Sequence, residues 1–283
     1  MWILYALLCT IALSVSVIFA KCGSRKADAT VTTALRTLTV TVCAWILLFS
    51  ENKTGLISTA NGTEWLYIIF TGIALTVSLI CYHVSLKSGS ATSVSVIMRT
   101  TPFLIILISV INHSFKSVII PIICVVLIGL GILFSCSRSK RSGGKWIIFG
   151  LLSSIAAVSS YIINATGVSL NSMAVEWTLI LSVSLLVSLI AIFIRGLHHG
   201  IGRIPFAEII FTVLSGIAAF LAFFLFRYAY FEGNREITTA ILSLSICSTA
   251  GLSALLLKER ISWKTICGLL LIIVGMLLFE FTV

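Results

Sequence analysis

Ten hydrophobic stretches, each close to the length that crosses a lipid bilayer, fill almost the whole of this 283-residue chain. A membrane-spanning helix needs about 20 mainly apolar residues. Hydrophobic residues make up 59% of the chain and charged residues 10%, and the longest polar connection, near residues 50–64, is too short to fold alone. We therefore predict an all-α integral membrane protein without a sizeable soluble domain. The predicted segments are 2–20, 29–49, 65–83, 91–111, 117–137, 146–164, 173–194, 206–226, 238–257 and 263–280.

The net charge of +10 arises from basic residues at the ends of these segments, a placement that excludes a nucleic-acid partner. Cytoplasmic loops of membrane proteins are rich in Lys and Arg. The even-numbered connections hold only Lys53, Lys116 and Arg235. The odd-numbered connections hold Lys21, Arg25, Lys26, Lys87, Arg138, Lys140, Arg141, Lys145, Arg195, Arg203, Lys258, Arg260 and Lys264. We expect a multi-pass protein of the plasma membrane with the odd connections in the cytoplasm and both termini outside.

The two halves of the chain repeat. At a constant shift of 144, Trp2, Ile3, Leu7, Leu8, Ala12 and Ser16 recur as Trp146, Ile147, Leu151, Leu152, Ala156 and Ser160. Further along, a shift of 146 pairs Tyr82 with Tyr228, Thr92 with Thr238 and Gly129 with Gly275. We predict five-helix repeats at 1–137 and 146–283, joined by a basic cytoplasmic linker at 138–145.

Because each repeat has an odd number of helices, the second must enter the membrane in the opposite sense to the first. Inverted repeats can exchange conformations and so open a shared central cavity alternately to each side of a membrane. This arrangement favours a transporter over an enzyme or a receptor.

The connection between the last two segments carries a family signature. It reads Leu257-Lys258-Glu259-Arg260-Ile261-Ser262, and Gly268 and Gly275 follow nine and sixteen residues after Glu259. This resembles the EamA module of the drug/metabolite transporter superfamily, in which Leu-Gly-Glu-Arg, a hydrophobic residue and Ser precede a helix with such glycines. Lys258 replaces the usual Gly, and His113 occupies the Glu position in the first half. The resemblance covers the whole chain and implies ten helices in two inverted repeats, a transport function and, in Arg36, that family's usual helix-2 arginine.

Arg36 and Arg99 are the leading candidate site residues, because ionisable side chains inside a bilayer are costly and commonly functional. Each lies seven or eight residues into its predicted helix, roughly 10–12 Å from the cytoplasmic face. Arg36 fits a membrane anchor and a pocket equally well. Arg99 favours a cavity wall, because Ser95, Thr100, Thr101 and Pro102 make a polar, kinked stretch around it.

The first segment and its repeat contain no acidic residue. A membrane interior with arginine and without carboxylates favours a substrate with a carboxylate or another anionic group, zwitterions included, which arginine can bind through two parallel hydrogen bonds. Glu259 is expected to brace its turn by pairing with Lys258 and Arg260. Arg227 is expected to reach the headgroups from within an aromatic belt.

Five further residues are candidates for substrate binding. His83 could take up a proton near neutral pH, although its place at a helix end favours a hydrated, interfacial side chain. Tyr161 and Asn164 could face either the cavity or the interface. Tyr82, Tyr161 and Trp45 are the aromatic candidates for recognising a cation.

No HExxH, GxSxG or Walker motif is present, so the chain is expected to be neither an enzyme nor dependent on a metal or another cofactor. The sequence predicts a secondary transporter that moves a small polar metabolite, an amino acid or a related carboxylate, by alternating access. Family resemblance slightly favours export. Besides substrate and lipid, a coupling ion or proton is a candidate partner. The alternatives are import of a cationic nutrient through aromatic recognition, and a membrane enzyme or lipid handler.

Overall fold

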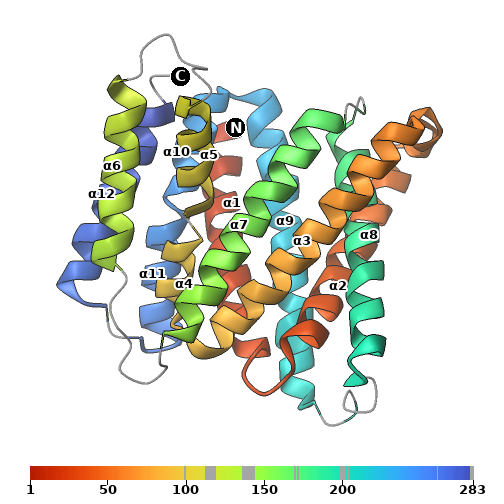
Figure 1. Ribbon diagram of the computed structural model, residues 1–283, viewed down its shortest axis with the longest axis horizontal. Coiled ribbons are helices and arrows are strands. Elements are labelled where there is room, and N and C mark those ends of the chain that lie inside the picture. The colour runs from red at the N-terminus through yellow and green to blue at the C-terminus, as the bar shows by residue number, and fades with distance from the viewer. Residues whose placement is uncertain are drawn as a thin grey trace.

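The computed structural model describes residues 1–98, 100–111, 119–135, 144–168, 170, 172–197, 202, 204–259 and 261–280. Within these ranges the chain forms α-helices and one short 3₁₀-helix, η1 (Thr54–Thr59). Figure 1 shows a bundle of helices, with α1 starting at the end of the bundle marked N. We call this end the N-terminal end and the opposite one the distal end. The prediction of an all-α membrane bundle is confirmed.

Among the described residues, six helices are long and apolar enough to cross a membrane: α1 (Trp2–Gly23), α2 (Ala29–Ser50), α3 (Gly62–Ser88), α7 (Lys145–Gly167), α8 (Met173–Ile194) and α9 (Phe206–Glu232). The shorter apolar helices α6 (Ile119–Ser135) and α12 (Trp263–Glu280) pack side by side at one edge of the bundle (Figure 1).

Two predicted segments are each divided into a pair of helices. The fourth segment forms α4 (Ala91–Ile97) and α5 (Thr100–Ile111), and the ninth forms α10 (Arg235–Ser243) and α11 (Ser245–Leu256). An interruption in the fourth segment agrees with the kink expected there, whereas the one in the ninth segment was not anticipated. Ser and Thr hydroxyls compete with the helical backbone for hydrogen bonds, and both interruptions are flanked by such residues. The breaks fall in corresponding helices of the two repeats.

Hydrogen bonds between helices reproduce the repeat. Ser16 Oγ of α1 donates to the carbonyl of Ser215 in α9 at 2.9 Å, and Ser160 Oγ of α7 donates to that of Thr71 in α3 at 3.3 Å. Adding 144 to Ser16 gives Ser160, and adding it to Thr71 gives Ser215. A second pair follows the same rule: Cys9 donates to the Ala222 carbonyl at 3.1 Å, and Ser153 donates to the Ser78 carbonyl at 2.8 Å. Helix α1 therefore packs on α9 as α7 packs on α3.

The structure relates the later helices of the two repeats by a shift of 144 residues as well. The sequence analysis had paired residues in this part of the repeats at a shift of 146. Helices α3 and α9 both have 27 residues and begin at Gly62 and Phe206, so the equivalent of Tyr82 is Phe226 and not Tyr228. In α6 and α12, a Cβ on Gly131 would lie 2.7 Å from the Gly268 carbonyl oxygen, and one on Gly275 would lie 3.2 Å from that of Cys124. These contacts interchange under a shift of 144, which makes Gly131 the counterpart of Gly275 in place of Gly129.

Candidate functional site

Described residues that include Arg36 line two neighbouring cavities in the bundle. The apolar chamber, 340 Å³ in volume, is lined by Cys9, Leu13, Arg36, Thr37, Val40, Leu75, Leu79, Trp177, Leu181, Ala219, Ala222, Phe223, Phe226 and Leu242. The polar chamber, 270 Å³ in volume, is lined by Leu13, Ser16, Val17, Arg36, Tyr82, Ser95, Met98, Ser245 and Thr249. Because Leu13 and Arg36 line both, the two chambers adjoin at these side chains.

The chambers follow one another along the bundle axis. In α1, Cys9 lines the apolar chamber and Ser16 lines the polar one, which lies further from the N-terminal end. Helix α8 contributes Trp177, near its start, to the apolar chamber, whereas the broken helices contribute Ser95 and Ser245 to the polar chamber. Arg36 thus lies at the boundary between an apolar and a polar compartment.

The Arg36 guanidinium has hydrogen-bonding capacity to spare. Its Nη2 donates to Ser16 Oγ at 3.3 Å, and its Cζ lies 6.0 Å from the centroid of the Tyr82 ring, at the limit of a cation–π contact. Its Nε is buried and has no hydrogen-bond partner among the described residues. A buried donor without an acceptor is costly, so an anionic acceptor at this position would be stabilised.

Arg36 has no charged counterpart in the second half. A Cβ on Gly216 of α9 would lie 2.7 Å from Thr39 Cβ and 3.0 Å from the Arg36 carbonyl oxygen. At the equivalent place, a Cβ on Gly72 of α3 would lie 2.7 Å from Val183 Cβ and 3.1 Å from the Ile180 carbonyl oxygen. Arg36 is therefore matched by Ile180, and the guanidinium breaks the symmetry of the scaffold.

His83 lies beside Tyr82 but has a different environment from the one expected. Its side chain is fully buried, its Nδ1 is 2.9 Å from Ser24 Oγ, and its Nε2 has no partner within the described part of the chain. The expectation of a hydrated, interfacial histidine is wrong, because Ser24 and the connection between α1 and α2 cover this part of α3. The His83 and Tyr82 rings are 5.4 Å apart.

Tyr161, Trp45 and Asn164 lie outside both chambers. Tyr161 is 56% exposed on the outer surface of α7. Trp45 joins α2 to α8, because its Nε1 donates to Ser182 Oγ at 3.0 Å. Asn164 has a buried Oδ1 with no partner in the described ranges, but it lines neither chamber. Arg99 lies outside the described residues.

The interruption between α4 and α5 adds polar groups near the polar chamber. The hydroxyl oxygens of Ser95, Thr100 and Thr101 are buried without hydrogen-bond partners among the described residues, and Ser95 lines the chamber. Broken helices at corresponding positions of two inverted repeats are typical of substrate sites in carriers, because their ends present free polar groups inside the membrane. Arg99 follows Met98, which lines the chamber.

Sequence reasoning missed the aromatic wall formed by Trp177, Phe223 and Phe226. The Trp177 ring lies 5.1 Å from that of Phe223. The sequence could have pointed to Phe226, because a shift of 144 residues makes it the equivalent of the candidate Tyr82. Trp177 and Phe223 are 46 residues apart along the chain, and their rings meet because α8 and α9 both pack against α2.

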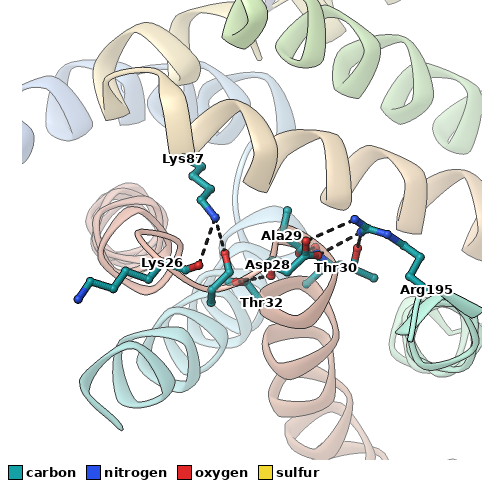
Figure 2. Close-up of polar contacts among 9 residues, drawn as sticks. Lys26, Asp28, Ala29, Thr30, Thr32, Lys87 and Arg195 are labelled. Carbon is teal, nitrogen blue, oxygen red and sulfur yellow. Dashed lines mark hydrogen bonds and ion pairs between the residues drawn. The ribbon is translucent and has the colours of Figure 1, made fainter. Parts of the chain in front are cut away.

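At the distal end, the connection between α1 and α2 forms polar contacts with neighbouring helices (Figure 2). Lys87 of α3 donates to the carbonyl oxygens of Lys26 and Ala27 at 3.2 and 3.0 Å. Arg195 of α8 pairs with the Asp28 carboxylate at 3.1 Å, and the Glu208 carboxylate of α9 accepts from the Ala27 N–H at 2.9 Å. Three helices, α3, α8 and α9, thus contact the one short connection between α1 and α2.

Glu259 also acts at the distal end. Its carboxylate accepts from the backbone N–H groups of Ala91 and Thr92 at 2.9 and 3.4 Å and so caps α4. This is the structural role expected for Glu259, but with a different partner: it joins the second half to the first instead of bracing its own turn. Arg260 and His113 lie outside the described residues.

At the N-terminal end, an ion pair connects the two halves of the chain. Arg227 of α9 binds Glu51, at the end of α2, through both guanidinium Nη atoms, with Nη2 3.0 Å from Oε2. Lys53 lies 2.8 Å from the same oxygen. Arg227 was expected to extend to lipid headgroups; instead its side chain is only 16% exposed because Glu51 holds it against α2.

Comparison with known proteins gives a family and a fold. The model of the EamA-like transporter family matches residues 1–137 and 144–281. A solved structure titled "Crystal structure of protein" superposes with a TM-score of 0.62 at 14% identity, over 97% of this chain and 94% of the other, which establishes a shared fold. No curated protein matches the chain. Within the described residues, no cluster of side chains could hold a metal ion.

Proposed function

The chain belongs to the EamA-like transporter family, and from that membership we propose that it is a secondary carrier for a small carboxylate, such as an amino acid or a related metabolite. Members of this family are multi-pass membrane proteins that transport small molecules. The observation that carries the proposal is Arg36, a buried guanidinium with an unsatisfied Nε at the boundary of two internal chambers.

Arg36 has the chemistry to bind the carboxylate of the substrate. Neither chamber is lined by an Asp or Glu among the described residues, so no protein carboxylate competes for the guanidinium there. Bidentate binding of a carboxylate would occupy its free N–H groups. The hydroxyls of Ser95, Ser245 and Thr249 would then bind the polar remainder of the substrate in the polar chamber.

The inverted repeats supply a route for alternating access. Contacts between α2 and α9 hold the helices together at the N-terminal end, and contacts of the α1–α2 connection with α3, α8 and α9 do so at the distal end. In the proposed cycle, the repeats rock about Arg36 so that one set of contacts opens while the other closes. We further propose export across the plasma membrane, with both termini outside and with repeats bounded as 1–137 and 146–283. A substrate, ion or proton gradient would supply the energy.

Counterflow in proteoliposomes tests this function. Wild-type protein should exchange internal and external carboxylate, Arg36→Gln should reduce exchange at least tenfold, and Arg36→Lys should restore little of it, because an ammonium cannot reproduce the planar two-pronged contact. The control is Arg25→Gln, at an exposed arginine of the distal end, which should exchange normally. Full exchange by Arg36→Gln would refute the proposed site.

The alternative of cation import is disfavoured by the same guanidinium, which would repel a cation from both chambers. The other alternative is a lipid handler, because an apolar chamber could hold an acyl chain; an experiment can test it. Scrambling of a labelled phospholipid by the reconstituted protein, together with absence of carboxylate counterflow, would favour it over the carrier.

A further inference from the structure

The apolar chamber contains little that a small polar molecule could bind. Its wall is mainly aliphatic and aromatic, and its polar side chains are Arg36, Thr37 and Cys9. The Cys9 thiol already donates to the Ala222 carbonyl. Apolar cavities inside proteins stay dry and bind apolar molecules, because water there lacks hydrogen-bond partners. A fully polar metabolite would therefore leave this compartment unused.

The volume of the apolar chamber indicates the size of the ligand group that would fill it. At 340 Å³, it exceeds the ~150 Å³ of an apolar cavity that accepts benzene, and it is comparable to small ligand sites. Trp177, Phe223 and Phe226 offer ring surfaces to such a group. A phenyl or branched alkyl group fits this space, and a single methyl group would leave most of it empty.

The position of Arg36 sets the orientation of the ligand. The guanidinium lies where the apolar chamber meets the polar one, so a bound carboxylate would point its substituents into both compartments. We infer that the substrate of this carrier is an amphipathic carboxylate: its carboxylate binds Arg36, and an apolar group the size of a phenyl ring or a branched alkyl chain occupies the apolar chamber. This inference rests on the proposed function and narrows its substrate class.

Matched ligands test the inference by titration calorimetry of the protein in nanodiscs. The first pair is propionate and 3-phenylpropionate, and the second is alanine and leucine. Burial of a phenyl or branched side chain should tighten binding about 10- to 100-fold. The alcohol 3-phenylpropanol, which has the ring but no carboxylate, should bind at least tenfold more weakly than 3-phenylpropionate.

Two variants locate the apolar group. Ala219→Phe fills the apolar chamber and should bring the affinity for 3-phenylpropionate down to that for propionate, with propionate itself unaffected. The matched control, Leu221→Phe, lies two residues further on α9 at a side chain that is 47% exposed, and it should bind both ligands as the wild type does. If Ala219→Phe does not yield monodisperse protein, Phe223→Ala removes part of the wall and should weaken 3-phenylpropionate selectively.

The outcomes separate this inference from the function on which it rests. Equal affinity for propionate and 3-phenylpropionate, with both lost in Arg36→Gln, would overturn the inference and leave a carboxylate carrier. Carboxylate binding that Arg36→Gln does not change would overturn both. Absence of carboxylate binding, with phospholipid scrambling that Ala219→Phe abolishes, would assign the chamber to a lipid acyl chain and also overturn both.

Discussion

At the scale of single residues, Arg36 is a buried charge whose removal from water carries a large free-energy cost. It holds a charge in the interior with a hydroxyl and an aromatic ring as its neighbours, and no ion pair involves it among the described residues. Removing a charge from water is expensive unless a partner charge compensates for it. A residue kept for stability would not be placed this way, whereas a substrate anion would provide the partner.

This reasoning predicts opposite effects of one substitution on stability and on transport. Arg36→Met should raise the melting temperature of the ligand-free protein, because it removes an uncompensated charge and retains apolar volume. It should also abolish counterflow. Thermal unfolding and exchange are measured on the same preparation. A lower melting temperature would show that Arg36 supports the fold and that its partners in the ligand-free protein are sufficient.

The ion pair at the N-terminal end predicts a dependence on pH. The hydrogen bond from Arg227, assisted by Lys53, lowers the pKa of the Glu51 carboxyl below its ordinary value of 4.5. A depressed pKa in the folded state contributes stability that is present above the unfolded pKa and is lost as pH falls through the folded pKa. The difference in melting temperature between wild type and Glu51→Gln should therefore be constant near neutral pH and shrink below about pH 4.5. A difference that stays constant to pH 3 would contradict the assigned pair.

At the scale of helices, close approach at small residues decides where Arg36 lies. Helix α9 crosses α2 at Gly216, next to the Arg36 backbone. Small residues at such crossings let two backbones approach in a membrane, where packing replaces the hydrophobic effect as the force between helices. The interrupted helices α4/α5 and α10/α11 contribute the side chains of Ser95, Ser245 and Thr249 to the polar chamber.

Two alanine substitutions in the second half test the crossing. Gly216→Ala should destabilise the protein by about 1–3 kcal/mol, because its Cβ would overlap Thr39 and the backbone of α2. Gly251→Ala, in α11, meets open space and should be neutral or stabilising by up to ~1 kcal/mol through helix propensity. Thermal unfolding compares the two. Equal stability would mean that α9 does not approach α2 as closely as described.

At the scale of the whole molecule, the two repeats pack alike, but the two ends of the bundle are held by different contacts. Packing of α1 on α9 is repeated by α7 on α3. The N-terminal end, however, is held by the ion pairs of Glu51 with Arg227 and Lys53, whereas the distal end is held by contacts of the α1–α2 connection with α3, α8 and α9. If the chain works by the proposed alternating access, these unequal contacts would give its two open states different free energies.

The proposed orientation can be tested directly by accessibility. In a variant without native cysteines, Ser142→Cys in the basic linker should resist an impermeant thiol reagent in intact cells, and Ser58→Cys in η1 should react. Both should react after permeabilisation, which controls for local burial. The reverse pattern would invert the topology and place the polar chamber on the outer side.

The sequence by itself determined the class of the protein and most of its helices. Bilayer thickness requires about 20 apolar residues for each span, so the stretches that became α1, α2, α3, α7, α8 and α9 are recognisable locally. The repeat was equally visible, because Ser16 and Ser160 occupy equivalent positions in the primary structure. A kink in the fourth segment was expected because Pro102 lies there, but the break in the ninth segment was not, since the hydroxyls that flank it occur in unbroken helices of this chain too.

Only the tertiary structure decided which polar residues share the interior. His83 is buried because Ser24 lies over it, Arg227 is held by Glu51, and Tyr161 faces outward although a hydroxyl would suit a cavity. Arg36 and Phe226 both line one chamber because α9 packs on α2, and this contact spans 190 residues of sequence. Apolar periodicity specifies that a helix is buried, but the depth and rotation at which two helices meet depend on side-chain shape along both, and that information is not local.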